Sequence, residues 1–230
     1  MERTVAKLPN LLLTESIDRR TFVAGALMVG GAVALPASGF AQSKIEEVAI
    51  DKLMAADELP ELSLGNKDAK VTIVEYASMS CPACARFHNT TYPELKKKYV
   101  DTGKVRFIMR EFPLNNLAAA GAMLARCADS PEKSIALIDV LFEKQREWLT
   151  NKAVVELLKI AKQAGFTEER FNKCLQDDKL LGKLSRRRDK ADKVFGVDAT
   201  PSFFVNGKRL RGNPSIEAFD KVLGPLLKSS

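Results

Sequence analysis

The spacing of apolar side chains divides this chain into predicted strands and helices. Residues 71–76 and 105–109 are short runs rich in β-branched and aromatic side chains, which is typical of buried strands. Residues 82–99, between them, carry apolar side chains at intervals of three and four, which predicts a helix. From residue 117 to about residue 194 the helical spacing continues, and no strand is predicted there.

Start and stop signals divide this long helical stretch into five predicted helices. Ser130-Pro131 and Thr167 are typical helix starts, because a hydroxyl can cap the free N–H groups of a first turn. Gly165 is a typical helix end. We therefore predict an all-helical insertion over residues 115–196.

Strand patterns return after the insertion. Residues 202–205 and 208–210 flank Asn206-Gly207, and Asn-Gly between two apolar runs is a strong hairpin signal. Ser215 begins the last predicted helix. The central strands are thus separated by the insertion.

These elements together predict one α/β domain over residues 67–230. Residues 42–66 are polar and are interpreted as an N-terminal segment before this domain. The chain has 230 residues, of which 46% are hydrophobic and 28% charged, so a disordered chain and a protein with many membrane spans are both excluded.

The N-terminal region has the three parts of an export signal. Arg19-Arg20 precede a charge-free stretch, residues 21–43, and small residues follow its apolar core. A stable membrane span needs about 20 strongly apolar residues, so an anchor is the less favoured alternative. We expect cleavage after Ala41. The Arg pair resembles a twin-arginine signal, but Asp18 departs from that motif and leaves the Sec route open.

Charge and cysteine content add two constraints. The net charge is +7, from 36 Lys and Arg against 29 Asp and Glu, a mild excess that gives no support for nucleic-acid binding. Four cysteines are too few for a disulfide-dense scaffold. Export to the periplasm would nevertheless allow disulfides to persist.

The sequence Cys81-Pro82-Ala83-Cys84 carries the candidate chemistry. It follows a predicted strand and opens a predicted helix. The free N–H groups and the dipole of a helix start stabilise an anion there, so Cys81 is placed where a thiolate is favoured. Cys84 lies one turn deeper. One accessible sulfur and one resolving sulfur are what thiol–disulfide exchange requires.

Two other readings of the pair are a zinc half-site and an inert bridge. Tetrahedral zinc needs further ligands, whereas the remaining cysteines are single and the chain has one His. That residue, His88, is about 10 Å along the helix from Cys81. We therefore predict no metal and interpret His88 as a hydrogen-bonded packing residue, not as a direct base.

Several further features accompany the cysteine pair: Glu75, Phe87 after the Cys81–Cys84 motif, Arg110-Glu111-Phe112-Pro113-Leu114, the helical insertion, and Thr200-Pro201 before the hairpin. In these features residues 65–228 resemble the DsbA family of exported thiol–disulfide oxidoreductases, which have the thioredoxin fold. This resemblance implies a thioredoxin-like fold with an all-helical insertion between the central strands.

The resemblance also implies a role for each matching residue. Cys81 would attack and Cys84 would resolve, with Pro82 and Ala83 supporting them. Glu75 would be a buried acid that handles the Cys84 proton. Pro201 would be a cis-proline facing the pair, and Thr200 would offer its backbone to an extended substrate. Many strongly oxidising members have His where this chain has Ala83.

The implied activity is the introduction of disulfide bonds into reduced exported polypeptides, without a cofactor. A membrane-bound or small-molecule oxidant would restore the Cys81–Cys84 disulfide. The alternatives are a disulfide isomerase or reductase, and a chaperone module without redox activity. Isomerases usually dimerise through an added domain, and the short segment before the first predicted strand favours a monomer.

Three other features have structural interpretations. Cys127 and Cys174 lie on apolar faces of predicted helices, so we predict a second, structural disulfide; two buried free thiols are the alternative. Arg186-Arg187-Arg188 is interpreted as a solvated helix face. Trp148 is interpreted as a packing residue.

Overall fold

The computed structural model describes residues 46–212 and 214–228, and the predicted signal peptide lies outside these residues. Five strands form one sheet in the order β1-β3-β2-β4-β5. Their bounds are β1 Leu62–Leu64, β2 Val71–Ala77, β3 Val105–Glu111, β4 Ser202–Val205 and β5 Lys208–Leu210. The two long strands β2 and β3 are parallel, and β1, β4 and β5 pair antiparallel to their neighbours.

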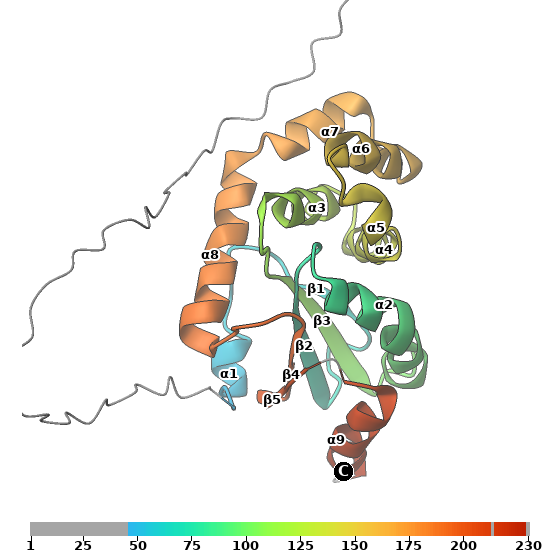
Figure 1. Cartoon of the computed structure of the whole chain (residues 1–230). Coiled ribbons are helices and arrows are strands. Elements are labelled where there is room, and N and C mark those ends of the chain that lie inside the picture. Colours follow the sequence, from blue (N-terminus) through green and yellow to red (C-terminus); the bar gives the residue numbers. More distant parts are fainter. Residues whose placement is uncertain (1–45, 213, 229–230) are drawn as a thin grey trace, which may run out of the picture. The chain divides into compact units, whose positions relative to one another are not determined.

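Helices cover both faces of this sheet (Figure 1). They are α1 Ile50–Leu53, α2 Pro82–Leu95, α3 Asn116–Arg126, α4 Pro131–Glu143, α5 Gln145–Trp148, α6 Ala153–Gln163, α7 Glu168–Leu175, α8 Asp178–Phe195 and α9 Ile216–Lys228, with a π-helical segment at Lys96–Val100. Successive side chains of β2 point alternately to the two faces of the sheet and pack into two different buried clusters. Ile73 shares a buried cluster with Phe87 of α2 and Phe219 of α9, whereas Val74 lies in a second cluster with Phe195 of α8.

The predicted helical insertion is confirmed. Helices α3 to α7 gather at one end of the sheet, and α8 returns along its side (Figure 1). The predicted caps are also found: the hydroxyls of Ser130 and Thr167 accept hydrogen bonds from the N–H groups of Lys133 and Arg170. The short helix α5 was not predicted.

The predicted domain boundary at residue 67 was wrong. Strand β1 lies within the segment interpreted as separate, yet Leu62 pairs with Met109 at the edge of the sheet. A three-residue strand with one polar position has too few residues to establish an alternating pattern. The described residues, 46–212 and 214–228, belong to one compact unit.

The interpretation of Arg186-Arg187-Arg188 as a solvated face was wrong for its central member. Arg187 has a side chain 1% exposed, and its guanidinium bonds Glu111 at 3.0 Å and Asp57 at 2.9 Å. Arg186 is exposed and pairs with Glu58 at the surface. Successive residues of an α-helix point about 100° apart around its axis, so Arg187 can face the interior while its neighbours Arg186 and Arg188 point away from it.

Trp148 is fully buried, as the packing interpretation requires, and its indole N–H donates to the Leu141 carbonyl at 2.8 Å. Among the residues that the structure describes, no helix is both long and apolar enough to cross a membrane.

Candidate active site

Cys81 is the N-cap residue of α2. Strand β2 ends at Ala77, and a short turn brings the chain to Cys81, whose backbone is extended while Pro82 begins the helix. Pro suits this first position because its missing N–H would have no intrahelical partner. The Cys81 sulfur accepts a hydrogen bond from the N–H of Cys84 at 3.3 Å. The cap that a Ser or Asp usually supplies is here a thiol.

The two sulfurs have opposite acid–base properties. The side chain of Cys84 donates a hydrogen bond to the Cys81 sulfur and is the main cause that lowers the pKa of Cys81, whereas burial opposes this effect. The Thr200 side chain and the backbone N–H groups of Cys84 and Ala83 add to it, and the pKa of Cys81 is lowered to about 6. Burial raises the pKa of the Cys84 thiol far above its usual range, and Cys81 and Glu75 add to this effect. Both thiols are free in this structure.

The loop before β4 lies against the sulfur of Cys81. The Thr200-Pro201 peptide bond is cis. The Cys81 thiol donates to the Thr200 carbonyl at 3.2 Å, although Thr200 lies 119 positions further along the chain. Ala83, Arg86, Thr200, Pro201 and Arg211 are among the residues that line a groove of about 300 Å³ beside this contact. A peptide that reaches the sulfur would therefore meet the loop.

Glu75 lies in the core below the pair, in the middle of β2. Its side chain is fully buried, and its Oε2 atom lies 3.0 Å from Nε2 of His88, which is 3% exposed. The other imidazole nitrogen, Nδ1, lies 3.3 Å from Asp139 on α4. Burial opposes a charge on His88, but Glu75 and Asp139 together raise the pKa of His88 to about 9. His88 is thus hydrogen-bonded and buried, and it is not positioned as a base for Cys81.

Gln145 is a site residue that the sequence analysis missed. Its buried amide nitrogen donates to the carbonyl oxygens of Met79 at 2.9 Å and Cys81 at 3.0 Å. It comes from α5, so the insertion holds the turn that carries Cys81. A single Gln after a helical run has no pattern that marks it, and only the tertiary contact shows its role.

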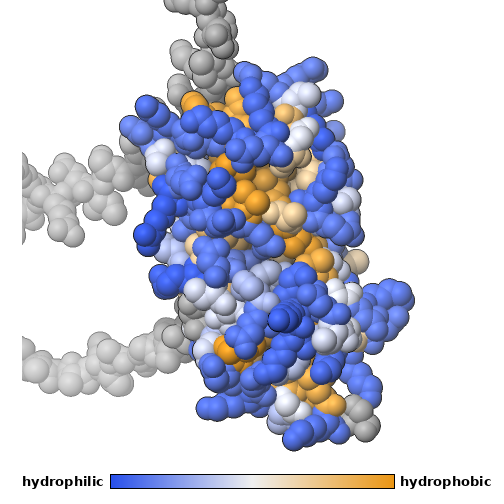
Figure 2. Space-filling view, turned by 90° about the vertical axis from the view of Figure 1, so that its right-hand side faces the viewer, coloured by the Kyte–Doolittle hydropathy of each residue, from blue (hydrophilic) through white to orange (hydrophobic). Residues whose placement is uncertain are grey.

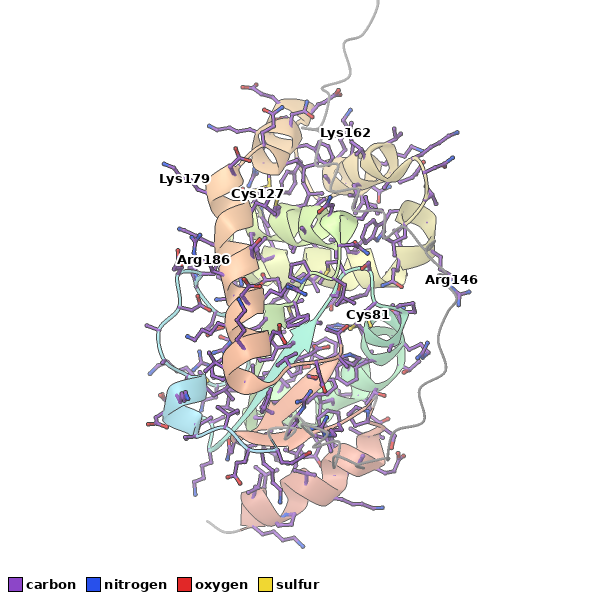
Figure 3. The ribbon with its side chains drawn as sticks, turned by 60° about the vertical axis from the view of Figure 1, so that its left-hand side comes forward. Cys81, Cys127, Arg146, Lys162, Lys179 and Arg186 are labelled. Atoms are coloured by element: carbon purple, nitrogen blue, oxygen red, sulfur yellow. A yellow bond between two sulfur atoms is a disulfide. The ribbon has the colours of Figure 1, made fainter. Side chains whose placement is uncertain are left out.

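The other two cysteines are joined in a disulfide. Cys127 follows α3 and Cys174 lies in α7, at a sequence separation of 47. Figure 3 shows Cys127 in the insertion, apart from Cys81 at the start of α2. Within the described part of the chain, no cluster of His, Cys, Asp and Glu could hold a metal ion.

A helix that begins with Cys-x-x-Cys, connects two parallel strands and faces a cis-proline defines a thioredoxin-type protein. Residues 57–224 match the family model described as thioredoxin. The chain is 31% identical over 173 residues to the "Probable disulfide bond formation protein D" of Bacillus cereus, a match that covers 72% of this chain and 78% of that protein. The chain belongs to the DsbA-like family of thioredoxin-fold proteins.

Two further similarities agree with this assignment. The crystal structure of Wolbachia pipientis alpha-DsbA1 superposes with a TM-score of 0.72 at 28% identity, covering 79% of this chain and 97% of that one. A Rickettsia bellii relative named "Putative protein-disulfide oxidoreductase" is 36% identical over 171 residues, 74% of this chain. The match spans 66% of that relative, just under two thirds of its length.

Proposed function

We propose that this protein is a periplasmic thiol–disulfide oxidoreductase that introduces disulfide bonds into exported polypeptides. The observation that carries the proposal is the contrast between Cys81, whose thiolate is stabilised at the start of α2, and the buried Cys84 thiol. A stabilised thiolate favours the reduced enzyme, which makes the enzyme's disulfide a good oxidant.

The proposed reaction begins from the Cys81–Cys84 disulfide. A substrate thiolate attacks the Cys81 sulfur, and Cys84 leaves as a thiolate that takes up a proton. A second substrate thiolate then attacks the substrate sulfur of this mixed disulfide, and the Cys81 thiolate leaves. The substrate loses two electrons and gains a disulfide, while the enzyme gains two electrons. An oxidant, membrane-bound or small, must then remove those electrons.

The groove beside Thr200 suits an extended, unfolded substrate. The Thr200 carbonyl lies 3.2 Å from the Cys81 sulfur, so a peptide paired with this backbone would hold its cysteine beside Cys81. Such recognition uses main-chain groups and tolerates many sequences. This supports polypeptides with various sequences as substrates, in preference to one small molecule.

The test compares oxidation with isomerisation. Oxidised wild-type protein is mixed with a reduced, unfolded protein of two cysteines, and separately with a scrambled disulfide protein. We expect stoichiometric oxidation of the first and slow repair of the second. Cys81→Ser should abolish oxidation. Cys84→Ser cannot form the enzyme disulfide, so it should not oxidise the reduced protein, but its Cys81 should attack the scrambled disulfide protein and remain trapped in a mixed disulfide. Faster repair than oxidation would contradict the proposal and favour an isomerase, and activity in the absence of both cysteines would favour a chaperone.

The proposed location has its own test. N-terminal sequencing of the protein from a periplasmic extract should find a chain that begins near Gln42. A full-length chain retained in the membrane would contradict cleavage and favour an anchor.

A further inference from the structure

Three ionisable side chains form a row that runs from the neighbourhood of Cys84 to the protein surface. Glu75 on β2 is fully buried, His88 on α2 is 3% exposed, and Asp139 on α4 is 42% exposed. Each comes from a different element, and consecutive members lie within hydrogen-bond distance, at 3.0 Å and 3.3 Å.

Aromatic side chains surround the His88 ring in the middle of this row. Phe142 stacks on the His88 ring with centroids 4.3 Å apart, and Phe87 packs edge-on at 5.5 Å. Tyr92 also packs against the imidazole, with ring centroids 4.8 Å apart, and burial raises the pKa of Tyr92 far above its usual value. Among the described residues, no Lys or Arg bonds Glu75, so His88 provides the nearby positive charge.

The sulfur of Cys84 needs a proton when the enzyme disulfide is broken. When Cys84 leaves as a thiolate, burial and the negative charge of Glu75 make that anion unstable. Glu75 Oε2 faces His88, whereas its Oε1 is buried and has no hydrogen-bond partner. Once Oε2 has accepted a proton, the neutral carboxyl group can rotate and release that proton on its free side.

We propose that His88 is the proton donor for Cys84, acting through Glu75, with Asp139 keeping its ring charged and oriented. In the forward step the Nε2 proton of the His88 imidazolium passes to Glu75, and the Glu75 carboxyl gives a proton to the Cys84 thiolate. His88 is left neutral, with its Nδ1–H donated to Asp139. The Cys84 thiolate gains the one proton that the His88 imidazolium loses. Reoxidation reverses each transfer, so the His88 ring keeps one orientation throughout. This inference rests on the proposed thiol–disulfide exchange.

The first test uses the wild-type protein. His88 is the only His in the chain, so its imidazole gives one unambiguous set of NMR signals. We expect both ring nitrogens of the oxidised protein to carry protons at pH 7, with titration well above the usual pH of about 6.5. A neutral His88 at pH 7 would have no proton to give and would overturn the proposal without any variant.

The second test is kinetic. His88→Gln can still donate a hydrogen bond to Glu75 but cannot release a proton. Reduction of its disulfide by dithiothreitol should slow by at least tenfold near pH 7 and recover partly at lower pH, whereas the Cys81 pKa in the reduced form should stay unchanged. Asp139→Asn should lower the pKa of His88 and slow the reaction less, and Glu143→Gln, an exposed carboxylate on the same helix, is the matched control.

The outcomes separate the two proposals. If wild-type protein does not oxidise dithiols, the proposed function fails. If wild-type protein is active and both His88→Gln and Asp139→Asn keep its rate and pH profile, the function stands and the role of His88 is overturned.

Discussion

The Cys81 sulfur lies 3.2 Å from the carbonyl oxygen of Thr200, a residue 119 positions further along the chain. The helical insertion separates these residues in sequence, and the pairing of β2 with β4 brings them together, since Tyr76 lies opposite Ser202. The same insertion provides Gln145, which bonds the Cys81 carbonyl. Cys81 is therefore held from two sides, by the sheet and by the insertion.

Reactivity of the reduced protein with iodoacetamide should follow the ionisation of Cys81. The pKa of about 6 predicts a half-maximal rate near pH 6. The measurement is the alkylation rate between pH 4 and 9, together with thiolate absorbance. A midpoint near 8.5, the value of a free thiol, would show that the helix start does not stabilise the anion.

The same pKa predicts how the stability of the reduced protein depends on pH. The folded pKa of Cys81 is lowered, so its contribution to the free energy of unfolding is complete above pH 9 and is lost as the pH falls through about 6. At pH 7 it is about 1.4 kcal/mol. Urea unfolding of the reduced wild type and of Cys81→Ala should show a difference that grows from pH 5 to pH 9. A constant difference would contradict the assignment.

Thr200→Val should raise the pKa of Cys81. The Thr200 side chain is one of the groups that lower it, and its buried hydroxyl has no hydrogen-bond partner in the structure, so it is free to donate to the Cys81 thiolate. Val removes that donor at nearly constant volume. A hydrogen bond to a charged group contributes about 1.5 kcal/mol, which corresponds to a shift of about one pKa unit. Thr200→Ser keeps the hydroxyl and should leave the pKa nearly unchanged. Equal shifts in both variants would indicate a packing effect.

Adjacent arginines of α8 should differ sharply in their effect on stability. Burial alone would raise the pKa of Glu111, but Arg126 and Arg187 hold it below its usual value. Arg187→Ala leaves this buried carboxylate with one partner and should reduce the free energy of unfolding by about 3 kcal/mol. Arg186→Ala removes a surface pair with Glu58 and should change it by less than about 1 kcal/mol. Similar losses, measured by urea unfolding, would contradict the difference in burial.

Loss of the Cys127–Cys174 disulfide should lower stability and leave activity intact. It closes a separation of 47 residues, for which chain entropy predicts about 4 kcal/mol. The double variant Cys127→Ala/Cys174→Ala should melt at a lower temperature and oxidise substrate at the wild-type rate. A loss of oxidation at a temperature where the variant is folded would assign this disulfide a role in the reaction.

The sequence predicted those parts of the fold that have local signals. The long strands, the capped helices and the Asn206-Gly207 hairpin each have a pattern that neighbouring residues establish, and all three are present. Strand β1 was not predicted, because it has only three residues and is defined by its pairing with β3. In the site, the Cys81–Cys84 spacing was evident, whereas the partnership of Glu75 with His88 joins two elements and appears only once α2 packs on the sheet.

The identity of residue 83 should set how strongly the protein oxidises. Ala83 lies in the first turn of α2 and offers only its backbone N–H to the Cys81 thiolate. Ala83→His would add an imidazolium beside that anion, which should lower the pKa of Cys81 further and stabilise the reduced form. Each pKa unit corresponds to about 1.4 kcal/mol, or about 30 mV in reduction potential. Equilibration with glutathione at pH 7 measures the change, and Ala83→Gln is the neutral control of similar size. If Gln raises the potential as much as His does, the charge of the side chain is not the cause.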